Sequence, residues 1–400
     1  METRNARPMS ESSFNLPMWL WVGCLIAVVA GVIALALAFH SSAREGWLWL
    51  IVDFVVFLGI ANGAIGWAAV FRVAQTRWAG AVNRLGHAMI FYMPLLFGVL
   101  IALLIGVEKF VPWVEHPIPE KAAWLNVPFF RIREVVSLGL LWILFGGMVS
   151  RSLTLDAKTR SGERIASEEH YRLTAISVTS VIWYTIAASI VSYDFIMSLS
   201  PKWVSTMFAP YFWVTNLYMG MAFLILSASL LRNVTGARDY LGPEQFHDMG
   251  NLLLGFSLFS MGLFFAQYLT IWYENLPEET HFLVLRYDKS SWMWLGWAAF
   301  IIGYGIPFLL LQSRHLKKSS GLSIIPAVLV LIGVSLERYV LIVPSVQPGH
   351  LAIYPLGAFG ALAFLGALVL TFCIFLRRYP PISSADVALK ESDMVLEVLQ

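Results

Sequence analysis

Charged residues are scarce in this chain: Asp, Glu, Lys and Arg make up 13% of its 400 residues, against 58% for the hydrophobic types. No polar stretch between Met1 and Gln400 is long enough to form a soluble catalytic domain. The mean hydropathy of +0.71 agrees with this distribution. The composition therefore places the activity of the protein inside a membrane or at its two surfaces.

Cysteine and the common cofactor motifs are also nearly absent. Cys24 and Cys373 are isolated in apolar runs, which excludes a Cys-rich iron–sulfur pattern and a C-x-x-C-H haem attachment site. The eight histidines lie in loops or at the ends of apolar runs, whereas a haem buried in a membrane needs His pairs that face each other at equal depth. There is no P-loop and no dinucleotide-binding fingerprint. We expect no metal site and no covalently bound or metal-ligated cofactor, and the net charge of +2 gives no reason to invoke nucleic acid.

Ten runs of about twenty apolar residues fill the chain, and this is the length that a bilayer-spanning helix needs. We therefore predict an all-α integral membrane protein with ten transmembrane helices. Tryptophans near the predicted ends, among them Trp113, Trp124 and Trp203, are typical of the interfacial aromatic belt. The predicted spans are 17–40, 47–72, 86–107, 134–152, 171–197, 203–232, 248–273, 290–313, 321–343 and 353–377.

Lys and Arg are distributed unevenly between the two sides of the membrane. If the N-terminus is cytoplasmic, the inner segments hold 18 of these residues and the outer segments hold 8, with Arg338 left inside a span. This bias predicts that both termini are cytoplasmic. Two connections are long. The outer segment Pro112–Arg133 is expected to lie on the membrane surface, and the charged inner segment Arg151–Arg172 is expected to be solvated and partly helical.

Ionisable side chains inside a bilayer are costly, so each one is a candidate for function. The ones predicted within about two helical turns of the outer face are Asp53, Glu134, Asp194, Glu337 and Arg338. Near the inner face, His247 and Asp248 are candidates that ordinary interfacial residues could also explain. This distribution predicts two proton-accessible vestibules, joined by hydroxyls, amides and water.

The fifth predicted span carries the most polar pattern. Ser177, Ser180 and Tyr184 fall at i, i+3 and i+7, on the way to Asp194 at the outer end. Such hydroxyls often bond to a carbonyl of their own helix, and for Ser and Thr we favour that interpretation. A carboxylate such as Asp194 needs a partner or a path for water. Proton-path candidates are Asp194, Glu134, Tyr184, Ser180, Ser177, Asp53, Asp248 and His247.

Two of the outer candidates also have a structural interpretation. Glu337 and Arg338 could form ion pairs that hold the ninth span in register, and we weigh this equally with a functional role. Asp53 lies close enough to the outer interface to be solvated.

Two segments resemble a known family. The stretch Ser192–Phe208 (SYDFIMSLSPKWVSTMF) is similar to a signature of polysulfide-reductase NrfD-type membrane subunits. The segment Trp272–Tyr287 (WYENLPEETHFLVLRY) resembles the outer-loop motif W-Y-x-N-x-P-E-E of the same family. Both segments look closest to the two such subunits of bacterial alternative complex III. The length of 400 residues and the ten spans match the shorter of these, the ActF-type subunit.

The resemblance implies a fold of two four-helix bundles within a single membrane domain, 1–400. The divisions are the tail and first span at 1–46, the bundles at 47–197 and 203–343, the last span at 353–377 and a cytoplasmic tail at 378–400. It also implies a bacterial inner-membrane complex that oxidises menaquinol or ubiquinol. The partners would be a paralogous ActC-type subunit, an iron–sulfur protein and multihaem cytochrome c subunits.

Residue roles follow from the same resemblance. Asp194, Ser198, Lys202 and Trp203 occupy the first motif and are candidates for the rim of a quinone site. Family members often have His at the position of Lys202, and this departure weakens the case for quinone contact there. An NrfD-type anchor of a molybdenum reductase is the nearest alternative. A secondary transporter is a more distant one, because no matched pair of interrupted spans surrounds a charged midplane site. A purely structural scaffold also remains open.

Overall fold

The computed structural model of the protein describes residues 17–76, 78–163, 165–232, 238, 240–288, 291–347 and 355–379. These residues form helices joined by turns and loops, with no strand in the described ranges. Ten of the helices are long and apolar enough to cross a membrane, which confirms the predicted all-α membrane fold.

The long helices are α1 (Met18–Ser41), α2 (Ala43–Val73), α4 (Met93–Gly106), α6 (Val127–Arg160), α7 (Ser167–Phe195), α8 (Phe208–Leu231), α9 (Pro243–Glu274), α14 (Ile324–Val346) and α16 (Ala361–Arg378). The eighth span is composite, with α11 (Met293–Phe300), a π-helical turn (Ile301–Gly305) and α12 (Ile306–Leu310). Shorter helices are α3 (Gly80–His87), α5 (Pro112–Glu115), α10 (Pro277–Tyr287), α13 (Arg314–Lys318) and α15 (Pro355–Ala358).

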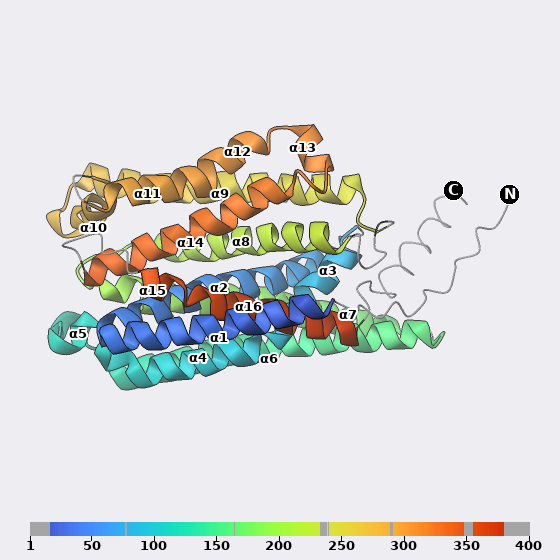
Figure 1. The fold of residues 1–400 in the computed structure, drawn as a ribbon, viewed down its shortest axis with the longest axis horizontal. Coiled ribbons are helices and arrows are strands. Elements are labelled where there is room, and N and C mark those ends of the chain that lie inside the picture. The colour runs from blue at the N-terminus through green and yellow to red at the C-terminus, as the bar shows by residue number, and fades with distance from the viewer. Residues whose placement is uncertain are drawn as a thin grey trace.

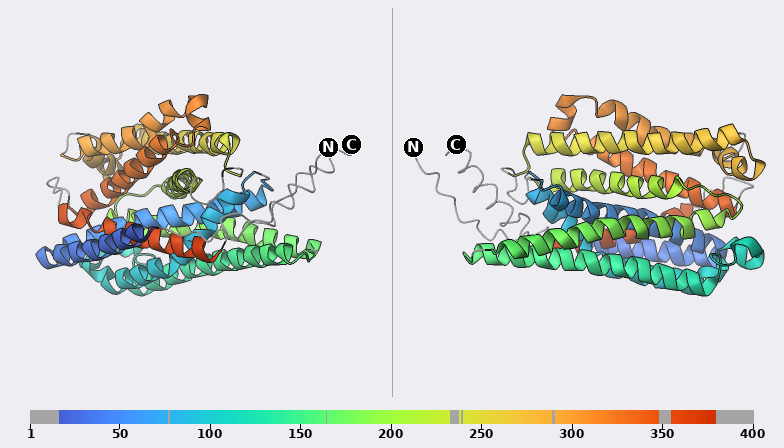
Figure 2. Two further views of the ribbon diagram at one scale, coloured as in Figure 1. Left: turned by 45° about the vertical axis from the view of Figure 1, so that its right-hand side comes forward. Right: turned by 180° about the vertical axis from the view of Figure 1, so that it is seen from behind.

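Helices α2 and α8 form the centre of the molecule (Figure 1). Helices α9, α11, α12 and α14 lie on one side of this pair, while α4, α6 and α7 lie on the other (Figures 1 and 2). Helices α1 and α16 pack along each other at the flank. In α2, 89% of the most apolar window is buried, against 17% in α1, so α2 is a core helix and α1 presents most of its surface outward.

The central pair is close because glycines face each other. A Cβ atom built on Gly63 of α2 would collide with the backbone of Asn216 and Gly220 of α8, and one built on Gly220 would collide with Gly63. Small residues at such a crossing let two membrane helices approach to backbone contact. A similar contact joins Gly303 of the π-helical turn to Gly333 of α14.

Several boundaries differ from the predicted ones. Helix α6 begins at Val127 instead of 134, so the end of the outer segment that was expected to lie on the membrane surface is the first part of a span. The sixth span begins at Phe208 instead of 203, because a 3₁₀ turn at Met197–Leu199 and a short loop come first. Helix α6 continues to Arg160, in agreement with the expectation that this inner segment is partly helical. Within it, Asp156 is fully buried and forms an ion pair with Arg84 of α3. The expectation of solvation is therefore wrong at Asp156.

The α2–α8 contact makes a testable prediction. Gly63→Ala should lower the free energy of unfolding by about 1–3 kcal/mol, because the new methyl group must push two backbones apart. Gly98→Ala is the matched control: Gly98 has open space around its Cβ position, and the change should be neutral or stabilising by about 0.5–1 kcal/mol. Denaturant titration of the protein in detergent micelles measures both. Equal effects of the two substitutions would contradict the close contact.

Candidate functional site

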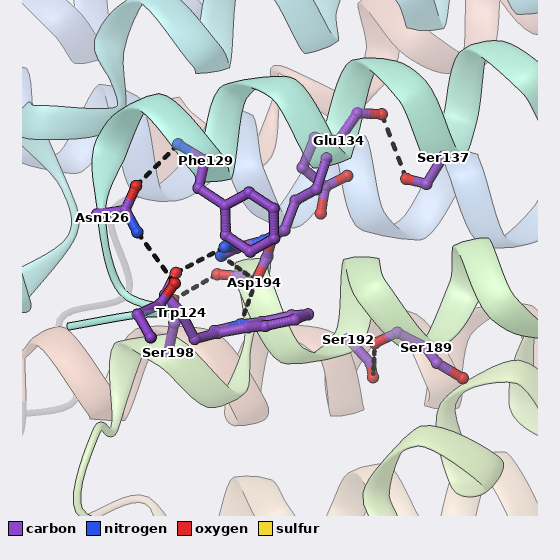
Figure 3. A network of polar contacts seen from close by, with 11 residues as sticks. Trp124, Asn126, Phe129, Glu134, Ser137, Ser189, Ser192, Asp194 and Ser198 are labelled. Atoms are coloured by element: carbon purple, nitrogen blue, oxygen red, sulfur yellow. Dashed lines mark hydrogen bonds and ion pairs between the residues drawn. The ribbon is translucent and has the colours of Figure 1, made fainter. Parts of the chain in front are cut away.

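The best-defined polar site lies where the first turns of α6 meet the last turn of α7, at the end of the bundle that is predicted to face outward. Asp194, in the last turn of α7, accepts hydrogen bonds from Arg133 Nε to Oδ2 at 2.5 Å and from Arg133 Nη2 to Oδ1 at 2.7 Å. Trp124 Nε1 donates to Asp194 Oδ1 at 3.2 Å. This two-pronged pairing of a guanidinium with a carboxylate is strong and sets the geometry of both groups (Figure 3).

The outer loop and the start of α6 hold Arg133 in place. Asn126 caps α6 by accepting a hydrogen bond from Phe129 N at 2.9 Å, which fixes where the helix begins. Arg133 Nη1 donates to Trp124 O at 2.6 Å. The guanidinium also lies over the Trp124 and Phe129 rings, 4.2 and 4.8 Å from their centroids. Sequence reasoning placed Arg133 in an outer loop and Trp124 in the aromatic belt, and so missed both partners of Asp194.

Glu134 is the second acid at this site. Its side chain is 0% exposed, and neither carboxyl oxygen accepts a hydrogen bond from a donor among the described residues. Its charged neighbours are Asp194 and Arg133. The site therefore combines two carboxyl groups with one guanidinium in a buried setting, and such a set becomes neutral when one carboxyl carries a proton.

A second buried cluster lies in the other group of helices. Glu337 of α14 accepts hydrogen bonds from Tyr211 of α8 and from Tyr304 of the π-helical turn, the latter at 2.6 Å. Arg338 donates to Thr215 and, at 3.1 Å, to Asn216 Oδ1. Its guanidinium lies 4.4 Å from the centroid of the Phe212 ring. Glu337 and Arg338 thus bond to neutral side chains, and not to the ion-pair partners that were one of their two interpretations.

The hydroxyls of the fifth span bond to nearby backbone. Ser177 donates to Leu173 O at 2.8 Å, and Ser180 donates to Ile176 O at 2.7 Å, each within α7. Tyr184 instead reaches α8 and donates to Trp213 O at 3.0 Å. These contacts match the structural interpretation of the two serines and show Tyr184 linking two helices.

The remaining proton-path candidates do not join these clusters. Asp53 is buried in α2 at 3% exposure, contrary to the expected solvation, and its Oδ2 has no hydrogen-bond partner in the described part of the chain. His247 and Asp248 lie at the start of α9, with His247 Nδ1 3.7 Å from Asp248 Oδ1, and both are partly exposed. Near the same face, burial and the charge of Arg84 lower the pKa of His87 to about 3, so this imidazole is neutral.

The predicted quinone-rim residues occupy two places. Ser198 donates to the backbone carbonyl of Asp194 at 2.5 Å, within the turn that follows α7. Lys202 and Trp203 instead line a cavity of about 590 Å³ between that turn, α10 and the end of α14. Trp203 stacks on Phe282 of α10 with ring centroids 3.6 Å apart. The cavity therefore lies where the two motif segments meet.

Taken together, ten spans and several buried acids define a multi-pass membrane protein that carries polar sites within apolar helices. Residues 36–348 match the family described as polysulphide reductase, NrfD, and the chain belongs to this family. Proteins of this family are membrane subunits of quinone-interacting reductase complexes. No curated protein sequence matches the chain.

The Arg133–Asp194 pair predicts a large effect on stability. Asp194→Asn leaves a buried guanidinium without its carboxylate, and we expect the free energy of unfolding to fall by about 3–5 kcal/mol. Glu108→Gln breaks the exposed pair with Arg131 at 3.1 Å and should cost about 0–1 kcal/mol. Denaturant titration in detergent compares the two variants. A similar small loss in both would show that the buried pair is not a structural anchor.

Proposed function

We propose that this chain is a proton-handling membrane subunit of a quinol-oxidising respiratory complex of the alternative complex III kind, in a bacterial inner membrane. It would pack beside a paralogous NrfD-type subunit, with an iron–sulfur protein and multihaem cytochrome c subunits at the outer face. The observation that supports a proton role is the buried acid pair, Glu134 beside Asp194, with a single guanidinium that is bonded to Asp194.

The two acids have different tasks in this proposal. Asp194 receives two hydrogen bonds from Arg133 and one from Trp124, so its negative charge is well compensated. Glu134 has no such donor among the described residues, so it is the group that gains and loses the exchangeable proton. Trp124, 39% exposed, stands between Asp194 and the outer side, where the proton would be released.

Glu337 is less suited to exchange. Both of its oxygens accept hydrogen bonds from tyrosine hydroxyls, so its acceptor positions are already engaged. Tyr211 and Tyr304 are 3.3 Å apart at their hydroxyls and extend this network across two helices. In our proposal this hydrogen-bond network stabilises the packing of the second group of helices, and the exchangeable proton is carried by Glu134.

The quinone, menaquinone or ubiquinone, is assigned to the complex and not to a rim formed by this chain. The four predicted rim residues are divided between the α7 turn and the cavity, and Asp194 is already engaged with Arg133. A quinol site needs a proton acceptor and a hydrogen-bond donor at one ring. The paralogous subunit is therefore the proposed quinone-binding partner.

Proton coupling tests the role of Glu134. Glu134→Gln keeps the size of the side chain and breaks no ion pair, so the complex should assemble and oxidise quinol. We expect the number of protons moved per electron, measured with the purified complex in liposomes, to fall to half or less. Glu337→Gln and the exposed Glu108→Gln are the controls and should leave that number unchanged. An unaltered ratio in Glu134→Gln would remove Glu134 from the proton path.

Purification tests the assignment to a complex. The tagged protein, isolated in mild detergent, should bring with it c-type haem absorbance, an iron–sulfur protein, extractable quinone and a second multi-span subunit. Recovery of a molybdenum cofactor would favour the reductase-anchor alternative. A colourless, solitary protein would contradict both and would direct attention to a transporter, which substrate uptake into liposomes would reveal.

A further inference from the structure

The cavity of about 590 Å³ lies near the end of α14 and before the start of α8, at the end of the bundle that is predicted to face outward. One wall comes from Ser200–Trp203, a second from α10 and a third from Pro344 and Ser345 at the end of α14. Four prolines are among its lining residues, Pro112, Pro201, Pro277 and Pro344. Because proline fixes its own backbone angle, the walls are stiff and the cavity is preformed.

Arg286 is the buried charge that lines this cavity. Its side chain is 0% exposed and donates to Phe282 O and Leu341 O, each at 2.8 Å, and to Ser345 Oγ at 2.5 Å. The guanidinium also lies over the Phe282 ring, 3.5 Å from its centroid. All of these partners are neutral, so none of them compensates the positive charge. Burial accordingly lowers the pKa of Arg286 to about 9.

Two other buried arginines each have a carboxylate partner. Arg84 pairs with Asp156, and Arg133 pairs with Asp194. Arg286 has no carboxylate within ion-pair distance among the described residues, although it lies beside a cavity that a ligand could enter. A buried cation is stable only with an opposite charge or a full set of hydrogen bonds. Arg338 also bonds only to neutral side chains, but it does not line this cavity. The combination at Arg286 of an uncompensated charge and an adjoining cavity therefore indicates an anion that comes from outside the chain.

The hydrogen-bonding groups of the cavity agree with an anion. Arg286 Nε and Trp203 Nε1 are buried and have no acceptor within the described part of the protein. Lys202 adds an exposed ammonium group at the rim, and His281 adds a ring nitrogen. Glu278 is the acidic member of the lining and is exposed, so it borders the opening and does not neutralise Arg286.

We propose that this cavity binds the phosphate of an anionic phospholipid from the outer leaflet, with Arg286, Trp203 and Lys202 as its donors. The lipid source fits the position, because the cavity opens where the spans meet the headgroup layer. It also fits the apolar part of the lining, with Leu199, Phe282 and Leu285 beside the donors. A neutral quinone would accept the same hydrogen bonds but would leave the charge of Arg286 uncompensated. The inference does not depend on the proton role of Glu134.

Lipid binding to the purified full-length chain tests this site. After delipidation in detergent, the chain is titrated with dioleoylphosphatidylglycerol or dioleoylphosphatidylcholine, and bound lipid is counted by native mass spectrometry. We expect phosphatidylglycerol to bind about fivefold more tightly or better, because the choline cation would face Lys202 and Arg286. Arg286→Gln should weaken phosphatidylglycerol about tenfold, since it removes a charge-assisted hydrogen bond.

Two further variants test the site with a substitution at an exposed residue and with a control away from the cavity. Lys202→Gln changes an exposed side chain, so it should fold even if Arg286→Gln does not, and it should weaken phosphatidylglycerol about threefold. Arg131→Gln removes a cation from the same face, away from the cavity, and should leave binding unchanged. Equal binding of both lipids, or of wild type and Lys202→Gln, would overturn the proposal.

Competition distinguishes the other occupants. Millimolar inorganic phosphate should not displace phosphatidylglycerol, because it lacks the contacts of the glycerol and acyl groups. Displacement by phosphate alone would make this a free-anion site and would refute the lipid source. If menadione displaces phosphatidylglycerol from both the wild type and Lys202→Gln, the cavity is a quinone site. That result would refute the proposal that its ligand is an anion.

Discussion

The ion pair between Arg133 and Asp194 determines how the outer ends of two spans meet. It joins the first turns of α6 to the last turn of α7, and Trp124 completes it from the outer loop. The same loop reaches the entrance of α8, where Lys121 donates to Pro201 O at 2.5 Å. One compensated charge thus orders a loop, two helix ends and the turn that carries the family signature. Glu134 follows Arg133 in α6, and the turn that follows α7 lines the cavity, so both lie next to this ion pair in the chain.

The buried acids differ in how many hydrogen bonds their carboxyl groups accept. This difference distinguishes acids with a structural role from the acid proposed to exchange a proton. Asp194 and Glu337 are each held by several donors, whereas Glu134 is buried beside a charge that is already paired. The same logic applies to cations, because Arg133 has its carboxylate and Arg286 does not. In a medium where uncompensated charge is costly, the incompletely satisfied groups are the ones left to bind a proton or a ligand.

The ten spans could be predicted from the sequence because apolar length is a local property. The acids at Glu134 and Asp194 could also be singled out, since any ionisable residue in an apolar run stands out. Their partners could not. Arg133 and Trp124 read as loop residues, and their contact with Asp194 depends on how a loop folds back over two helices. Asp156 was misjudged for the same reason: its charged surroundings in the sequence hide a tertiary pairing with Arg84.

The π-helical turn constrains the length of the eighth span. A π turn amounts to one residue inserted into an α-helix, and everything on one side of it is rotated by about 100° relative to an uninterrupted helix. Here the turn contains Tyr304, which meets Glu337, and Gly303, whose carbonyl accepts from Tyr218 at 3.0 Å. Loss of a single residue from 301–305 would restore a regular helix of the same hydropathy. It would also turn Tyr304 away from its carboxylate, so the length of this segment is under constraint even where its composition is not.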